Sequence, residues 1–519
     1  MRLHGRVADA LERVHADDLD EHLSELVYHY EDAKPEKAVR YAIDAARAAL
    51  DRLAFEDAAN ICRRGIQAAE RARRAGVEVA LTEEFDLLLA LGKAELSAGQ
   101  DGRKTLLEAF ELAAELNDAH RQAAAVLAVN RGFFSRFGRI DRKLVAALER
   151  AIAAQSTDDT TELAELLATL ASEVVWADDA EQCVGLSDRA LAMARRVGDT
   201  RTLARVLLLR NLTIASPDTL AQRVTDCDEL LAIAETLHDP GLMFQAAFHR
   251  SGTAMEAGNV AAANEMVELA AQLAQELNQP SLMFLTSMMR TSRRILEGAL
   301  DEAERGAHAT LELGQRANQG GEATIFFTEL LLEIRRWQGR LAEVLPDFVE
   351  LAGVPGIDFG YSLVRYLYDA GEHDAALTHY RSIMRDQPIP PRRDLLAGAT
   401  LCHLAYLAAR AGDTKNAARI YDALTPLAGS FANTTVAKPV TEHFLGMLAA
   451  TLGDVAAAEA HFSVAVAAHE SVHAPLFVAE TQVEWARLLA DHGRDTERAA
   501  ALGATAVETA TRLGARFLT

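Results

Sequence analysis

Three arginines recur at a constant interval in the middle of the chain. Arg210, Arg250 and Arg290 are separated by 40 residues each. In a stacked repeat this register places their guanidinium groups in a row on equivalent helices, with Arg131 and His249 as further candidates nearby. Such a row could bind an acidic peptide or a phosphate through bidentate hydrogen bonds. In the alternative interpretation, which we favour, each arginine pairs with a neighbouring acidic residue and has a structural role.

A second group of residues, near the N-terminus, has the side chains that ligate divalent metals. It consists of His15, Asp17, Asp18, Asp20, Glu21, His22 and Glu25. Asp17 and Asp18, however, stand where helix caps are expected, ahead of a helix that begins near Leu19. His22 and Glu25 would then lie on the solvated face of that helix. We therefore predict a structural role for this group and no bound metal.

The usual sequence signatures of catalysis are missing. The chain has no HExxH, GxSxG or GxGxxG motif, and Gly99–Thr105, its nearest approach to a phosphate-binding loop, has the wrong spacing. Its four cysteines are scattered, without a CxxC pair, as expected of buried thiols in a reducing compartment. We predict a protein that is not an enzyme and that carries no metal or cofactor.

The composition limits the classes of partner. With 519 residues and a formal net charge of −23, the chain lacks the excess of lysine and arginine that nucleic acids or anionic membranes attract. No apolar leader or run of eighteen apolar residues occurs, so we expect a cytoplasmic protein. Half of the residues are hydrophobic but only 6% are aromatic, which favours closely packed helices rich in alanine and leucine.

Glycine-containing breaks between apolar helical stretches recur about every 40 residues. Examples are Gly258, Gly298, Gly339, Gly412 and Gly453. A second break lies midway in each period, so each period holds two helices of roughly fifteen residues. Glycine provides the left-handed end of one helix, and the Asp or Asn that often follows caps the next. The pattern predicts an all-α, right-handed superhelical solenoid of antiparallel helix pairs.

Small and aromatic residues follow these glycines at fixed distances. Gly453 is followed by Ala457, Ala458 and Phe462, and the stretches after Gly371 and Gly412 repeat the design. This pattern resembles the tetratricopeptide repeat (TPR), although a period near 40 exceeds the usual 34. A break rich in glycine and proline at 351–360 suggests three parts: an N-terminal helical cap at 1–52, a TPR-like array at 53–352 and C-terminal TPR-like repeats at 353–519. Loops at 388–391 and 426–439 are candidate contact surfaces or inert insertions.

The N-terminal segments Leu3–Glu12, Leu26–Tyr30 and Lys37–Ala42, with the later stretches Leu91–Glu95 and Leu445–Gly453, resemble a known family. They are similar to the C-terminal TPR arrays of large bacterial regulatory ATPases of the STAND or AAA-like class, including LuxR/MalT-type regulators and cyclase-linked ATPases. The chain departs from that family because it has no ATPase, cyclase or DNA-binding motif. The resemblance therefore implies a detached regulatory half.

Two functions follow from these observations. The first is a non-catalytic TPR-like scaffold or sensor that binds a protein or peptide partner in bacterial signalling or transcription regulation, for which a regulatory ATPase or cyclase is a candidate. The alternative is a MalT-like array that closes around a small effector molecule. A peptide requires a continuous open groove, whereas a metabolite requires a closed pocket with convergent polar groups. Both interpretations predict that the chain binds neither nucleic acid directly nor a membrane, and neither predicts the oligomeric state.

Overall fold

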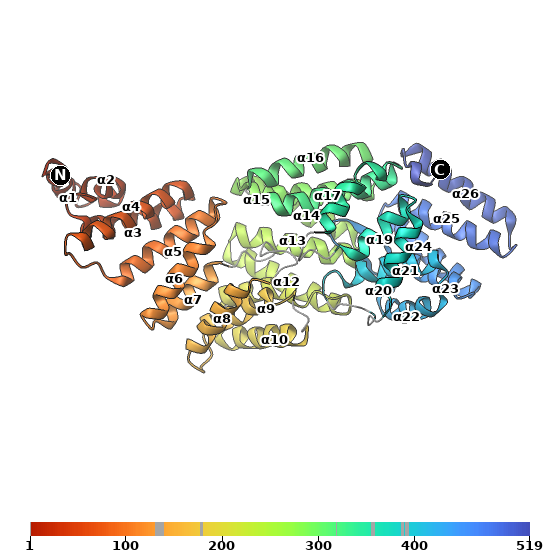
Figure 1. Cartoon of the computed structure of the whole chain (residues 1–519), viewed down its shortest axis with the longest axis horizontal. Helices are drawn as coiled ribbons and strands as arrows, with labels where there is room; N and C mark the ends of the chain where they lie inside the picture. Colours follow the sequence, from red (N-terminus) through yellow and green to blue (C-terminus); the bar gives the residue numbers. More distant parts are fainter. Residues whose placement is uncertain are drawn as a thin grey trace. The chain divides into compact units, whose positions relative to one another are not determined.

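The fold of the chain is all-α, as predicted, with one small β-hairpin. The computed structural model describes residues 2–129, 140–176, 180–317, 319–353, 359–385, 389 and 394–518. Figure 1 shows its helices in chain order. Helices that follow one another in the sequence pack together as antiparallel pairs. None of the described helices is both long enough and apolar enough to cross a membrane.

The first helices are short to medium in length. Their bounds are α1 Arg2–Val14, α2 Leu23–Tyr30, α3 Pro35–Asp51, α4 Phe55–Arg74, α5 Leu81–Ser97, α6 Arg103–Glu115, α7 Ala119–Val129, α8 Arg142–Ala154, α9 Thr161–Glu173, α10 Ala180–Val197 and α11 Thr200–Thr213. A one-turn 3₁₀ helix, η1 Leu19–Glu21, lies between α1 and α2.

The later elements include the most regular repeats. The helices are α12 Leu220–Leu237, α13 Pro240–Glu256, α14 Val260–Leu277, α15 Pro280–Leu296, α16 Leu300–Arg316, α17 Gly320–Trp337, α18 Leu345–Ala352, α19 Gly360–Asp369, α20 His373–Ile383, α21 Ala397–Ala411, α22 Thr414–Leu424, α23 Thr441–Thr451, α24 Val455–Ser471, α25 Pro475–Asp491 and α26 Thr496–Arg512. Further 3₁₀ helices are η3 Pro217–Thr219, η4 Leu341–Glu343, η5 Thr425–Leu427 and η6 Arg516–Leu518. The strands β1 Phe431–Asn433 and β2 Ala437–Val440 pair antiparallel.

The chain divides into two compact units. The first comprises the described residues through Val174 together with Gly185–Val206, and the second consists mainly of the described residues from Leu207 onward. The boundary predicted at 352/353 lies inside the second unit, where α17 contacts both α18 and α19. The boundary predicted at 52/53 lies inside the first, where α3 and α4 pack closely.

The 40-residue period is most regular from α12 to α17. Helices α12, α14 and α16 begin at residues 220, 260 and 300, and α13 and α15 each begin with a proline, 40 residues apart. Gly258 and Gly298 have φ angles of 72° and 77°, the left-handed conformation predicted for the breaks. His238 and Asn278 have the same conformation at the alternate turns, with φ angles of 52° and 49°. Both breaks of each period therefore end a helix in the same way.

The predicted N-caps are also present in these repeats. The side chain of Asp239 accepts a hydrogen bond from the backbone N–H of Leu242 at 3.0 Å, and Asn259 accepts one from Ala262 at 3.1 Å. Asp454 caps α24 in the same manner through Ala457, at 3.0 Å. Each cap satisfies one of the backbone donors that a helix leaves unpaired in its first turn. Local sequence thus fixes where these helices begin.

The predicted loop at 426–439 is not an exposed surface. It contains β1 and most of β2, and the hairpin packs against α13, α21 and α24 inside the second unit. Phe431 is 1% exposed and lies against the backbone of Gly258, and the backbone N–H of Val440 donates to His469 Nε2 at 3.0 Å. The hairpin is therefore part of the core of this unit, and neither a contact surface nor an inert insertion describes it.

An ionic cluster lies in the interior of the second unit. The fully buried Arg336 donates to Asp369 Oδ2 at 2.6 Å and to Glu333 Oε1 at 3.3 Å, and it also pairs with Glu480. Its guanidinium lies over the ring of Trp337, 4.5 Å from the centroid. These contacts join α17, α19 and α25, which are far apart in the sequence. The positive charge of Arg336 holds the pKa of the Glu480 carboxyl at about 2, despite the opposing effect of burial.

Candidate partner-binding groove

The recurring arginines lie on α11, α13 and α15, and each is paired with an acidic residue of α12 or α14. Arg210 Nε lies 3.1 Å from Asp226 Oδ2. The next pair joins Arg250 Nε to Asp228 Oδ1 at 2.5 Å. The following repeat has a bidentate pair between Arg290 and Glu268, with an Nε–Oε1 distance of 3.3 Å. Such pairing is what the structural interpretation of the arginine row predicts.

The three arginines differ in how much of each side chain reaches solvent. Arg210 is 3% exposed, Arg250 is 17% exposed and Arg290 is 46% exposed. Arg250 and Arg290 occupy equivalent positions, because each lies eleventh in its helix and pairs with an acid 22 residues earlier. Arg210 departs from this pattern, since its partner follows it in the sequence. Among the three, Arg290 is therefore the most accessible to a partner.

The two remaining candidates do not join this arrangement in the same way. Arg131 lies outside the described residues. His249 is half-buried on α13, with its ring 5.4 Å from that of Phe248. Burial lowers the pKa of His249 to about 4, so its imidazole is neutral near pH 7. His249 therefore contributes packing surface and no positive charge at that pH.

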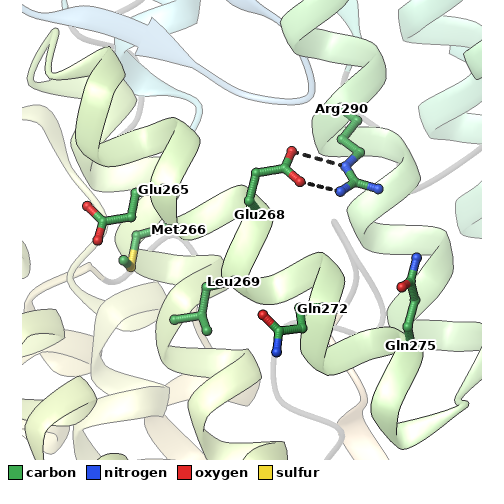
Figure 2. A pocket seen from close by; sticks show the side chains of 7 residues that line it. All are labelled: Glu265, Met266, Glu268, Leu269, Gln272, Gln275 and Arg290. Carbon is green, nitrogen blue, oxygen red and sulfur yellow. Dashed lines mark hydrogen bonds and ion pairs between the residues drawn. The ribbon is translucent and has the colours of Figure 1, made fainter.

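A cavity of about 520 Å³ lies beside Arg290. One stripe of α14 forms most of its wall, because the lining residues follow at intervals of three and four along the helix. The lining consists of Glu265, Met266, Glu268, Leu269, Gln272, Gln275 and Arg290. Figure 2 shows Arg290 facing Glu268 from α15, and the two amides farther along α14. The wall thus combines two apolar side chains, two amides and an ion pair.

A second cavity, of about 460 Å³, adjoins the first and extends across α15 to α16. The two cavities share Gln275 and Arg290. The lining of the second is Ala271, Gln275, Met283, Thr286, Ser287, Arg290, Thr291, Arg294, Glu302, Gly306 and Leu313. We call the two cavities together the α14–α16 groove. Its length crosses three consecutive helices of the array, with Arg290 at the junction.

The charges of the groove nearly balance. Glu268 holds the Nε and Nη2 atoms of Arg290, and Arg294 Nε lies 3.4 Å from Glu302 Oε2. Glu265 adds a further acidic group at one end. Because the arginines are already paired with carboxylates, the groove does not form the strongly positive surface that a phosphate requires. Its polar groups are better suited to a segment of neutral or mixed charge.

The hydrogen-bonding groups of the groove match those of a peptide backbone. Gln275 is exposed, and its amide can both donate and accept. Gln272 is also exposed, and its amide donates to Glu276 Oε1 at 2.8 Å. Met266 and Leu269 lie on one side of these amides along α14, and Met283 of α15 lines the second cavity together with Gln275. This combination of apolar and amide side chains can accommodate an extended segment with small apolar side chains.

Most of the groove residues were not among the sequence candidates, which included only Arg290. Glu268 could have been found, because an acid occurs 22 residues before both Arg250 and Arg290. Met283 lines the groove, whereas Met288, on the same helix, is 7% exposed and belongs to the core. Nothing in the sequence distinguishes Gln272 and Gln275 as candidates for binding, because exposed glutamines are common on helices.

Comparison with known proteins shows no match to a family model and no match among curated proteins. Among solved structures, a STAND protein with a tetratricopeptide-repeat sensor from Pyrococcus horikoshii aligns over 72% of this chain, at 12% identity and a TM-score of 0.37. This chain spans half the length of that protein. Aspartyl phosphate phosphatase F from Bacillus subtilis aligns over 67% of this chain and 93% of its own, at 14% identity and a TM-score of 0.38. Yeast Tom70 aligns over 95% of this chain and 99% of its own, at 12% identity and a TM-score of 0.34.

Proposed function

We propose that this chain is a non-catalytic, TPR-like scaffold whose α14–α16 groove binds an extended segment of a partner protein. The observation that carries the proposal is the pair of adjoining cavities that meet at Arg290 and Gln275. A helical-repeat array offers a rigid surface whose exposed side chains determine what it binds. The expected setting is bacterial signalling or transcription regulation in the cytoplasm, where a regulatory ATPase or cyclase would be a suitable partner.

The chemistry of the groove defines the class of segment. Lysine and arginine residues do not outnumber acidic residues in the groove. We therefore expect a segment without a dense run of phosphates or acids. Main-chain groups of the segment would bond to Gln275, Gln272 and the outer nitrogen of Arg290. Small apolar side chains would contact Met266, Leu269 and Met283. We therefore expect affinities typical of short peptide motifs, in the micromolar range (about 10⁻⁶ M).

The small-effector alternative has a different structural requirement. A bound metabolite needs polar groups that converge on an enclosed space, and charged groups converge in the ionic cluster around Arg336. There Arg336 pairs with Glu333, Asp369 and Glu480. Mass spectrometry of the native protein distinguishes the two functions. A retained metabolite would favour the effector-sensing function, whereas a protein that binds peptides and retains no metabolite would favour the scaffold function.

The proposal can be tested by selecting ligands from a displayed library of random peptides. Each selected peptide is then offered to protein that carries a photo-crosslinking amino acid at position 272. We expect covalent attachment at this position, since Gln272 lies in the middle of the first cavity. The matched control places the same amino acid at Ala232, the exposed residue one repeat earlier in the equivalent position of α12.

The outcome is decided by comparing these two positions. Crosslinking at 272 that exceeds crosslinking at 232 supports the groove, and competition by the unlabelled peptide should abolish it. Equal crosslinking at both positions would contradict the proposal, as would peptides that attach only at 232. A library that yields no peptide with measurable affinity would also count against a peptide-binding function.

A further inference from the structure

The turn between α1 and α2 brings two histidines and two acids together. The backbone of this turn is closed by hydrogen bonds from Asp18 N to His15 O at 3.1 Å and from His22 N to Leu19 O at 3.0 Å. Leu11 and Leu19, on either side, pack against the core of the first unit and fix the turn on it. The imidazoles of His15 and His22 face each other with ring centroids 3.7 Å apart.

The acids of this turn do not cap helices, as their sequence positions suggested. Asp18 is the N-cap residue of η1, but its side chain accepts no hydrogen bond from that helix. Its carboxylate instead lies 3.1 Å from His15 Nδ1. Glu25 Oε2 lies 3.4 Å from His22 Nδ1, and the Glu25 side chain is 61% exposed, as expected of the solvated face of α2. The capping explanation for this group is therefore wrong for Asp18.

The histidines of this turn are less accessible than its acids. The His15 and His22 side chains are 29% and 22% exposed, whereas those of Asp18 and Glu25 are 52% and 61% exposed. Ligand atoms of His15, Asp18 and His22 all lie within 4.8 Å of one another. The neighbouring acids Asp9 and Glu12 are already engaged by Lys34 and Lys37, at 2.6 and 2.8 Å. Asp18 and Glu25 have no lysine or arginine partner among the described residues.

We propose that His15, Asp18 and His22, whose ligand atoms gather within 4.8 Å, form a zinc site at the α1–α2 turn, with Glu25 beside His22 as the fourth ligand. In a tetrahedral zinc centre with bonds near 2.1 Å, neighbouring ligand atoms are about 3.4 Å apart. The two His–carboxylate separations of 3.1 and 3.4 Å have this size. Two neutral imidazoles and two carboxylates also balance the charge of Zn²⁺. The site would fix the position of α1 on α2, independently of any partner in the α14–α16 groove.

The test uses the full chain without a histidine tag, stripped of metal by EDTA and then titrated with Co²⁺. Tetrahedral Co²⁺ gives visible absorption bands, and Zn²⁺ should displace it. We expect one equivalent per chain. The double variant His15→Gln/His22→Gln should weaken binding at least about 100-fold, and Glu25→Gln about 10-fold.

A matched control comes from a histidine pair on α1 and α2, the helices that flank this turn. His4 Nδ1 and His29 Nδ1 lie 2.9 Å apart, outside the zinc site. The variant His4→Gln/His29→Gln should retain the wild-type affinity for zinc. Wild-type affinity in His15→Gln/His22→Gln, loss of affinity in the control pair, or absence of stoichiometric binding at micromolar metal would each overturn the proposal.

A second measurement does not depend on the folding of a variant. Diethyl pyrocarbonate modifies accessible imidazoles, and mass spectrometry locates each modified histidine in the wild-type protein. Zinc should protect His15 and His22 and leave His29 as reactive as before. Protection of His29 to the same extent, or no protection of His15 and His22, would contradict the site.

Discussion

The second unit contains two sets of arginine–carboxylate pairs in opposite surroundings. Arg336 is fully buried and binds three carboxylates from α17, α19 and α25, whereas Arg290 is 46% exposed and binds only Glu268. Arg336 and its carboxylates are buried away from water, so each charge is stabilised mainly by the opposite charges around it. Removing Arg336 therefore costs much of the folding free energy that these contacts provide. The surface pair contributes little to folding, because water and salt screen it. Similar chemistry thus supports the fold in one place and leaves a guanidinium available to a partner in the other.

The strongest test of this contrast removes Arg336. The variant Arg336→Gln removes the cation that Glu333, Asp369 and Glu480 share. The ion pairs that they keep with Arg365 and Lys438 are longer, at 3.6 to 3.9 Å, so we expect a loss of about 3–5 kcal/mol in the free energy of unfolding. Urea unfolding followed by circular dichroism measures the change. The matched variant Arg290→Gln should cost less than about 1 kcal/mol. Equal losses in the two variants would remove the distinction between the pairs.

A second test uses pH, because buried histidines lie near the same cluster. Burial lowers the pKa of His443 to about 4 and that of His469 to about 3, from 6.5. The unfolded chain therefore binds protons that the folded chain does not, so the stabilising contribution is complete above pH 6.5 and is lost as the pH falls toward 4. For His443 the loss is on the order of 3 kcal/mol.

Urea unfolding at pH 7.5, 6.5, 5.5 and 4.5 would show this loss as a falling midpoint. The Glu480 carboxyl, with a pKa of about 2, loses its contribution only between about pH 4.5 and 2, so it does not account for the earlier decrease. His443→Gln should make the profile less steep between pH 6.5 and 4.5, and the slope that remains includes the contribution of His469. An unchanged midpoint over that range in the wild-type protein would show that these histidines titrate normally in the fold.

The third test concerns binding at the surface pair. Arg290→Glu places a second acid beside Glu268 and removes the donor at the junction of the two cavities, so we expect at least a 10-fold loss of peptide affinity, or about 1.4 kcal/mol. Fluorescence anisotropy with a selected peptide measures this loss, and helical content should not change. Arg250→Glu, at the equivalent position one repeat earlier, should reduce affinity less. Loss of helical content in Arg290→Glu would instead assign Arg290 a structural role.

The helices of the array could be predicted from the sequence because their determinants are local. Gly258 ends α13 and Asn259 caps α14 through bonds within a few residues, so a repeated glycine followed by an Asp or Asn was sufficient. The groove could not be predicted in the same way. Whether Arg290 is exposed or buried depends on which helices pack around it, and Arg210, in the same register, is buried beside Asp226.

The ionic cluster around Arg336 was still harder to predict from the sequence than the groove. Arg336 and Glu480 are 144 residues apart, and nothing in the period of the repeats relates them. The hairpin was also missed, because a stretch containing proline, glycine and threonine reads as a loop until α13, α21 and α24 are placed around it. Sequence periodicity therefore determines each helix pair, whereas contacts between distant repeats arise only from the folded chain.

The smallest effect that we expect is a change in the relative affinities for acidic and neutral partner segments. Glu268→Gln keeps the shape of the side chain but releases two nitrogens of Arg290, those that now bind the carboxylate. An exposed pair of this kind contributes a few tenths of a kcal/mol to folding, so the urea midpoint should barely change. A neutral peptide should bind the variant with an affinity within about twofold of that for the wild type. A peptide with one aspartate at the groove should bind the variant about threefold more tightly, because its carboxylate can pair with Arg290 without competition from Glu268. Isothermal titration with both peptides checks this, and tighter binding of the neutral peptide alone would show that Glu268, and not Arg290, controls what the groove accepts.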